Sequence, residues 1–140
     1  MLMYYLLESW NFRRFLVFRN DGAKDWNSNL LISVNHQGRQ HHLQFHHIFP
    51  KAVLKNKYTV REVNDITNLS FIGGKTNRKI SNKKPEVYFG EILAKQGGET
   101  FQKQCIPTNI TSTDDYPRFI EERRKLIAQR LNRFLEEIIR

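Results

Sequence analysis

The sequence predicts an α+β fold, in which a small core of two antiparallel strands and a helix is surrounded by several helices. Apolar residues recur at three- and four-residue spacings near both ends, which predicts an amino-terminal helix over 1–18 and a long carboxy-terminal helix over 115–140. Between them, residues 39–48 alternate with a period of two, and residues 67–73 have strand composition. Helices at the ends and strands in the middle indicate the α+β class.

The length and composition fit one domain. At 140 residues, we expect a single domain over 1–140 with its motif core at about 39–82 and the two terminal helices as covering elements. The single cysteine, Cys105, excludes an internal disulfide and a paired-cysteine zinc site, as expected for a protein of the cytoplasm. No segment resembles a signal peptide or reaches the roughly 18 apolar residues of a membrane span.

Turn residues divide the chain into further elements. Among the buried positions of the first helix we expect Leu6, Trp10 and Phe18. The segment 30–34 is a strand candidate, and it is expected to form a hairpin or strand pair with 39–48. After Pro50 the sequence predicts a short helix over 51–57, a strand that closes on a glycine pair at 73–74, a short helix at about 75–82, and a helix over 85–96.

Basic residues cluster in the middle of the chain. The whole sequence has 23 Lys and Arg against 14 Asp and Glu, a net charge of +9. From Lys51 to Lys84 nine basic residues accompany two acids, so this quarter of the chain carries +7. The pattern is typical of a surface that binds phosphates, although a generic solvated surface is the alternative.

Two adjacent histidines end the predicted strand over 39–48. Alternation places His46 on one face with Gln44, and His47 on the other face with Phe45. The two imidazoles should therefore have different roles: one can bind a metal ion, while the other takes a proton from an attacking water. The helix after the glycine pair could return the amide oxygen of Asn77 to the metal.

The same residues carry a family resemblance. The segments 46–51 and 65–85 resemble the HNH endonuclease motif, in which a histidine pair, a middle Asn and a final His or Asn recur: HHIFPK and DITNLSFIGGKTNRKISNKKP. Three further segments are similar to the carboxy-terminal nuclease part of GmrSD-type restriction proteins, and the likeness covers nearly the whole chain: GAKDWNSNL, NRKISNKKPEVYFGEIL and FIEERRKLIAQRLNRFL. The resemblance implies a ββα-metal core.

The resemblance also implies roles for four residues. His46 is expected to be a metal ligand, His47 the general base, Asn68 the residue that orients the base and its loop, and Asn77 the second ligand. Asn77 stands where many relatives have His, which favours one Mg²⁺ or Mn²⁺ over softer ions. The structural alternatives are a turn brace for Asn68 and a helix cap for Asn77.

Other side chains receive plainer interpretations. Phe49 and Phe71 are expected in the core, Asp25 and Trp26 in packing and turn formation, and the charged run over 121–125 on a solvated helix face. Basic side chains near the motif are expected to bind the nucleic-acid backbone: Lys51, Lys75, Arg78 and Lys79.

Together these features predict a metal-dependent endonuclease that hydrolyses DNA, as the nuclease part of a restriction or antiviral defence system. Relatives usually carry a separate amino-terminal nucleotide-handling domain, and nothing before residue 40 resembles one, so we expect such a partner to be separate or missing. The alternatives are a non-catalytic module that binds nucleic acid or docks on a restriction complex, and a nuclease that acts on RNA.

Overall fold

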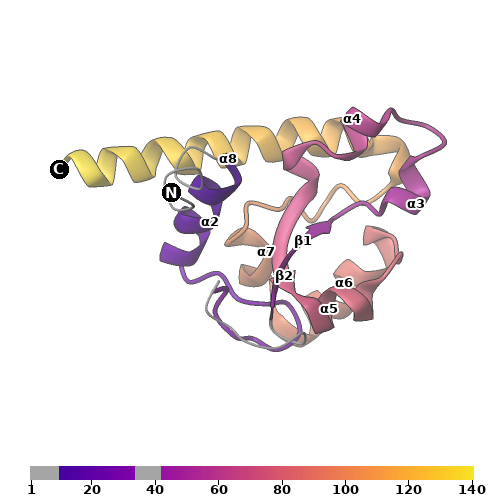
Figure 1. Cartoon of the computed structure of the whole chain (residues 1–140), viewed down its shortest axis with the longest axis horizontal. Helices are drawn as coiled ribbons and strands as arrows, with labels where there is room; N and C mark the ends of the chain where they lie inside the picture. Colours follow the sequence, from indigo (N-terminus) through magenta and orange to yellow (C-terminus); the bar gives the residue numbers. More distant parts are fainter. Residues whose placement is uncertain (1–9, 34–41) are drawn as a thin grey trace.

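The computed structural model describes residues 10–33 and 42–140, and it confirms the α+β class. Two antiparallel strands, β1 (Leu43–His47) and β2 (Leu69–Gly73), form the sheet, and α5 (Gly74–Ile80) follows directly on β2 (Figure 1). The long helix α8 (Tyr116–Ile139) runs along one side of the molecule. Strand, connecting segment, strand and helix thus follow in the expected order.

The remaining elements surround this core. The turn chemistry explains several of their ends: Thr59 and Glu62 form a capping box at the start of α4, Pro85 occupies the first turn of α6, and Gly97 ends α6 with a φ of 84°. The elements are α2 (Trp10–Asn20), α3 (Lys51–Leu54), α4 (Val60–Val63), the 3₁₀ turn η1 (Ile66–Asn68), α6 (Pro85–Gln96), α7 (Glu99–Gln102) and the 3₁₀ turn η2 (Thr113–Asp115).

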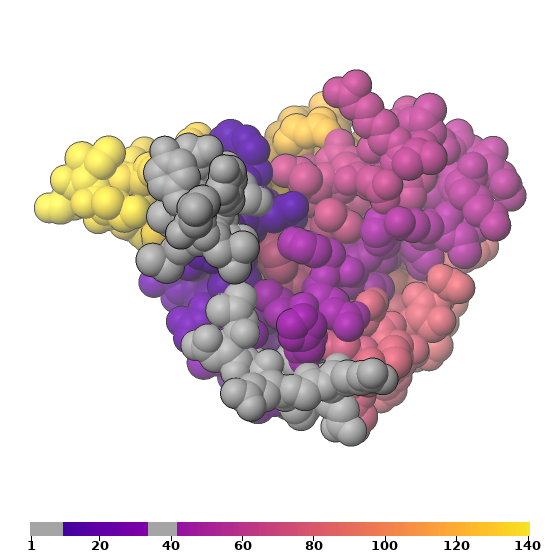
Figure 2. Space-filling model, in the orientation of Figure 1, coloured from indigo at the N-terminus to yellow at the C-terminus, as the bar shows by residue number. Residues whose placement is uncertain are grey.

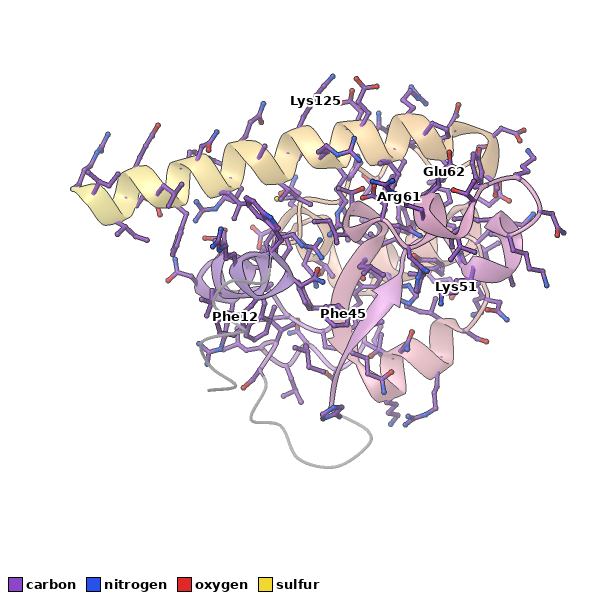
Figure 3. The ribbon with its side chains drawn as sticks, turned by 45° about the horizontal axis from the view of Figure 1, so that its top comes forward. Phe12, Phe45, Lys51, Arg61, Glu62 and Lys125 are labelled. Atoms are coloured by element: carbon purple, nitrogen blue, oxygen red, sulfur yellow. The ribbon has the colours of Figure 1, made fainter. Side chains whose placement is uncertain are left out.

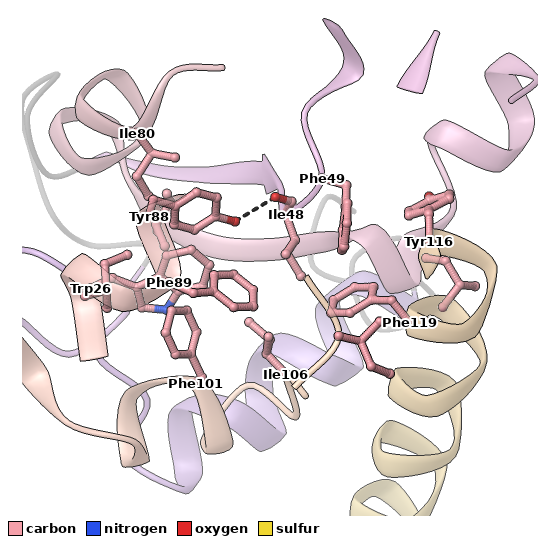
Figure 4. Packing of buried hydrophobic residues seen from close by; sticks show 14 of the residues in the cluster. Trp26, Ile48, Phe49, Ile80, Tyr88, Phe89, Phe101, Ile106, Tyr116 and Phe119 are labelled. Carbon is pink, nitrogen blue, oxygen red and sulfur yellow. Dashed lines mark hydrogen bonds between the residues drawn. The ribbon is translucent and has the colours of Figure 1, made fainter. Parts of the chain in front are cut away.

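Alternation along the strands separates two apolar clusters. The first cluster contains Ile72 of β2 and Ile48, together with residues of α6, α7 and the start of α8, and Figure 4 shows its aromatic centre. The second cluster contains Phe71 of β2, packed against Phe15 and Phe18 of α2 and Ile127 of α8. The expected core positions Phe49 and Phe71 are confirmed, since both are buried. His46 lies on the face of the first cluster, and Phe45 on the face of the second.

The outer edge of β2 is closed by side chains rather than by a third strand. Residues 68, 70, 72 and 74 direct their backbone groups toward β1, so the groups of Leu69, Phe71 and Gly73 face away from it. Gln104 bonds both the N–H and the carbonyl of Phe71, at 2.8 and 2.7 Å. The other outward groups are also bonded: Arg14 and Arg123 donate to the Leu69 carbonyl, and the Gly73 N–H donates to Asp25.

Two local expectations were wrong, and a third fails at one residue. Residues 30–33 form no strand, only an isolated bridge between Lys24 and Leu31, because β1 pairs with β2 instead. Three parts of the predicted elements lie outside the described residues: Leu6, residue 34, and residues 39–41 at the start of the predicted strand over 39–48. Trp10 is 60% exposed, since its ring lies against the Arg13 guanidinium on the surface.

Arg123 is the exception to the third expectation, that the charged run over 121–125 lies on a solvated helix face; the other four residues of the run are exposed, as expected. The Arg123 side chain is 0% exposed, and its guanidinium donates to the carbonyls of Thr67, Leu69 and Gln104. A guanidinium can be buried where most of its donors meet acceptors that would otherwise be orphaned, and in Arg123 Nη1 and Nη2 do so while the buried Nε has no partner. The helix extends farther than its apolar contacts, since Ile138 is 63% exposed.

Within the described ranges, no helix is both long enough and apolar enough to cross a membrane.

The closed edge of β2 gives a stability prediction. Gln104→Ala leaves the buried N–H and carbonyl of Phe71 without partners, so we expect the free energy of unfolding to fall by about 2–4 kcal/mol. Gln102→Ala, which truncates an exposed glutamine of the same segment, should change it by less than about 0.5 kcal/mol. Urea unfolding followed by circular dichroism measures both. Equal losses in the two variants would contradict the structural role of Gln104.

Candidate active site

The end of β1 departs from strand geometry just after the histidine pair. Ile48 and Phe49 are consecutive, yet both lie in the first apolar cluster, which a regular strand does not allow. Asn68 holds the chain in this bend: its Oδ1 accepts from Phe49 N at 2.9 Å, and its Nδ2 donates to the carbonyls of Phe49 and Val63. Asn68 is fully buried, and its side chain bonds the backbone of the loop that follows His47, whereas the His47 ring is bonded to Asn64.

His46 and Asn77 come together across the strand and the helix. The Nδ1 atom of His46 lies 2.9 Å from Oδ1 of Asn77, and Nδ2 of Asn77 donates to Oε1 of Gln44 at 2.8 Å. Because the amide oxygen can only accept, the imidazole carries its proton on Nδ1 in this arrangement. Gln44 lies two residues before His46 on the same face of β1, and it orients the Asn77 amide.

Burial keeps the His46 imidazole neutral. The residue is 2% exposed, and burial lowers its pKa from 6.5 to about 4; the bond to Asn77 opposes this shift, and charge on His47 adds to it. Desolvation disfavours the protonated ring because water can no longer solvate the charge. The ring therefore offers a neutral nitrogen, the form that binds metal ions, throughout the neutral pH range.

The His46–Asn77 pair could hold a hard divalent ion. Two ligands at about 2.1 Å and at right angles around one octahedral ion are about 3.0 Å apart, close to the separation seen here. One imidazole nitrogen and one amide oxygen leave most positions for water and phosphate oxygens, as Mg²⁺ and Mn²⁺ prefer. Over residues 10–33 and 42–140, no group of three or more His, Cys, Asp or Glu side chains could hold a metal ion.

His47 lies at the end of β1 in a different environment. It is half-buried, and its Nε2 atom lies 2.9 Å from Oδ1 of Asn64, the residue that ends α4. Burial lowers the pKa of His47 below 6.5; the Asn64 bond opposes the shift, and the nearby Lys51 charge adds to it. The ring is therefore mainly neutral at pH 7 and, with Nε2–H donated to Asn64, presents a free Nδ1 lone pair that can accept a proton.

The basic residues expected near the motif differ in their placement. Lys51 begins α3, directly beyond the end of β1 (Figure 3), and its charge acts on His47. Lys75 and Arg78 are exposed on α5, the helix that carries Asn77. Lys79 donates to Oδ1 of Asn27 at 3.0 Å. In Figure 2 the chain from β1 to α4, in magenta, is exposed over much of the viewed face. The Lys51 side chain is exposed.

Asp25 fixes the junction between β2 and α5. Its carboxylate accepts from Gly73 N at 2.7 Å and from the Thr76 hydroxyl at 2.5 Å, and it also closes its own turn by accepting from Asn27 N and Ser28 N. Burial alone would raise the pKa of Asp25, but these hydrogen bonds outweigh it and lower the pKa. The expected turn and packing roles of Asp25 and Trp26 are confirmed.

Sequence reasoning missed three partners of the site residues: Gln44, which bonds Asn77, and Asn64 and Tyr88, which contact the histidines. Gln44 had a signal, because the period of two places it on the face of His46. Asn64 had none, since an Asn at a helix end is common in any protein. Tyr88 also had none: it belongs to the apolar face of α6, and only the tertiary structure brings its hydroxyl to His46.

Asp25 gives a prediction for stability and pH. Asp25→Asn should lower the free energy of unfolding by roughly 2–4 kcal/mol at pH 7, because charged acceptors form the stronger hydrogen bonds. A lowered folded-state pKa stabilises the fold fully above the ordinary value near 3.9, and the contribution is lost as pH falls through the folded value. The gap between wild type and variant should therefore narrow below about pH 4.

Chemical denaturation at several pH values measures this gap. Glu136→Gln, at an exposed position near the end of α8, is the matched control and should be nearly neutral at every pH. A gap for Asp25→Asn that stays constant down to pH 3 would contradict the assignment.

Comparisons with known proteins place the sequence beside one family and one relative. The family model for the C-terminal domain of GmrSD restriction endonucleases matches residues 6–136. The uncharacterized protein MJ0686 of Methanocaldococcus jannaschii is 29% identical over 117 residues. The match covers 64% of this chain and 20% of that relative. The chain therefore matches about a fifth of the length of that relative. No solved structure matches.

Proposed function

From the premise that this chain belongs to the family of C-terminal domains of GmrSD restriction endonucleases, we propose that it is an HNH-type endonuclease that hydrolyses DNA phosphodiester bonds with one Mg²⁺ or Mn²⁺ ion. The observation that carries this proposal is the 2.9 Å separation of His46 Nδ1 and Asn77 Oδ1, beside a second histidine. A strand and a helix supply these two atoms, in the sequence order strand, strand, helix.

In this proposal His46 and Asn77 would hold the divalent ion, His46 through Nδ1 and Asn77 through Oδ1. A bound ion supplies positive charge that stabilises the developing charge on the phosphate oxygens. Gln44 keeps the Asn77 amide in its orientation by accepting from Nδ2. The burial of His46 keeps protons from competing for its ring at neutral pH.

His47 is the proposed general base. Its Nδ1 lone pair takes a proton from the attacking water, while Nε2–H stays bonded to Asn64 and fixes the ring. A pKa below 6.5 leaves the ring unprotonated at pH 7, as a base must be at the start of the reaction. Asn68 acts indirectly, since it holds the bend at Phe49 that positions the end of β1.

The proposed substrate is bound mainly through its phosphates. Three basic side chains are exposed near the site: Lys51 on α3, which follows β1 with its two histidines, and Lys75 and Arg78 on α5, which carries Asn77. Such contacts position the backbone without reading bases, so sequence or modification specificity requires other contacts. The family model describes a C-terminal domain, which supports a separate amino-terminal domain as the partner.

A second candidate function is a non-catalytic module that binds nucleic acid through the same surface. The hydrogen bond between His46 and Asn77 favours it, because the pair satisfies itself without an ion. RNA as the substrate is a further alternative. Plasmid DNA and a matched RNA, each with and without divalent ions, distinguish these functions.

The general base gives the first prediction for activity. His47→Ala should lower the rate of plasmid nicking with Mg²⁺ by about 10²- to 10⁴-fold, the usual contribution of a positioned acid or base. His42→Ala, which removes an exposed imidazole just before β1, should nick at close to the wild-type rate. Gel assays of supercoiled plasmid under single-turnover conditions measure both rates.

Two outcomes of this assay oppose the proposal. If the wild type leaves DNA intact with every divalent ion yet binds it in a salt-sensitive way, the binding module is correct. If nicking continues in EDTA, the metal requirement fails. Cleavage by His47→Ala at the wild-type rate would remove His47 as the base while leaving the nuclease assignment in place.

Lys51 gives a prediction for binding. Lys51→Ala should weaken DNA binding and reduce the slope of log K against log salt by about 1, because one fewer counterion is released. Lys125→Ala is the matched control, since this lysine lies on α8 and pairs with Glu121 and Glu122 (Figure 3). Fluorescence anisotropy over a range of salt concentrations measures both slopes, and identical slopes in wild type and Lys51→Ala would exclude a phosphate contact.

A further inference from the structure

Tyr88 of α6 lies against the side of His46 that faces away from Asn77. Its hydroxyl oxygen is 3.4 Å from Nε2 of His46, and the two rings meet edge to face with centroids 5.8 Å apart. The same hydroxyl donates to the carbonyl of Ile48 at 2.6 Å, the bond drawn in Figure 4. Tyr88 is buried, and Trp26 lies against both rings, so neither ring can turn freely.

The Ile48 bond decides what Tyr88 can offer to His46. A phenol has one proton, and this proton is committed to the Ile48 carbonyl, so toward Nε2 the hydroxyl can only accept. With the imidazole proton on Nδ1, as the Asn77 bond requires, Nε2 carries a lone pair. Two lone pairs then face each other at 3.4 Å, and no hydrogen bond forms there.

The proposed ion site requires the other tautomer. If His46 Nδ1 and Asn77 Oδ1 both direct lone pairs at one ion, the imidazole proton must reside on Nε2. A ligand histidine usually donates its second ring N–H to a fixed acceptor, which sets the tautomer and the ring orientation. The Tyr88 oxygen is that acceptor, because its own proton is already used.

We propose that Tyr88 is a positioning residue of this centre, and that His46 changes from the Nδ1–H to the Nε2–H tautomer when a divalent ion binds. The ring releases its Nδ1 proton to solvent water and takes up one proton from solvent water at Nε2, so it is neutral before and after and no net proton is released. Nε2–H then donates to Tyr88, which donates to Ile48, and this chain anchors the ligand to the backbone at the end of β1. The inference rests on the proposed metal centre and adds to it the residue that makes the second tautomer favourable.

The tautomer itself can be measured. Two-bond ¹⁵N–¹H correlation spectra distinguish the protonated from the unprotonated ring nitrogen of each histidine in the ¹⁵N-labelled chain. We expect His46 to show Nδ1–H without metal and Nε2–H at saturating Mg²⁺, a diamagnetic ion. The same Nδ1–H form in both conditions would overturn the inference.

A pair of variants tests the role of Tyr88 in affinity. Tyr88→Phe removes the acceptor for Nε2–H and should weaken Mn²⁺ binding roughly 10- to 100-fold, the usual effect of losing an outer partner of a ligand histidine. Tyr116→Phe is the matched control: it removes another buried hydroxyl that donates to a carbonyl at 2.6 Å, that of Glu62, without touching His46. Both variants lose one hydroxyl-to-carbonyl bond, so thermal unfolding should be similar in the two.

Titration of free Mn²⁺ by electron paramagnetic resonance gives the affinities. Equal affinity in wild type and Tyr88→Phe, or an equal loss in both variants, would overturn the positioning role. Failure of this inference is distinguishable from failure of the proposed function. If EDTA-sensitive nicking occurs but the tautomer does not change, only the inference is wrong; if neither Mg²⁺ nor Mn²⁺ binds at His46, the metal centre and the inference are both wrong.

Discussion

The structure depends on the closure of the outer edge of β2. A sheet of two strands leaves one row of backbone groups on each strand without a strand partner, and on β2 this row is buried. Gln104 pairs with Phe71 as a neighbouring strand would, and Asp25 accepts from Gly73. Arg14 and Arg123 both donate hydrogen bonds to the Leu69 carbonyl. Four side chains from four distant parts of the chain thus replace a third strand.

This closure also determines where the site forms. With β2 held on its outer edge, the register His46↔Ser70 fixes how far β1 extends, and the bend held by Asn68 ends it just after His47. Asp25 bonds both Gly73 and Thr76, so the same carboxylate sets the start of α5 and therefore the position of Asn77. A 2.9 Å contact between a strand and a helix needs such rigid support.

The sequence predicts those parts of the fold that rest on local patterns. Apolar periodicity located α8, and the proline and glycine signals bounded α6 at Pro85 and Gln96. Pairing was harder, because it is non-local: the segment 30–34 has strand composition, yet β1 pairs with residues about 25 positions later. Buried Arg123 was also unpredictable, since a single arginine in a charged run looks the same whether its donors meet water or carbonyls.

The candidate site divides in the same way. The residue pattern predicts a site of His46, His47, Asn68 and Asn77, and the structure brings His46 and Asn77 into contact. The Asn68 side chain bonds the backbone of Phe49, and the residue bonded to the His47 ring is Asn64, not Asn68. The contacts that tune the histidines come from α4 and α6, and no sequence signal links these helices to β1.

The central claim is that His46 and Asn77 share one divalent ion. Diffraction from crystals soaked in Mn²⁺, with data collected for anomalous scattering, locates such an ion without reference to activity. The account predicts an anomalous peak about 2.1–2.2 Å from both His46 Nδ1 and Asn77 Oδ1. A Mn²⁺ peak elsewhere, with His46 Nδ1 still hydrogen-bonded to Asn77, would contradict it.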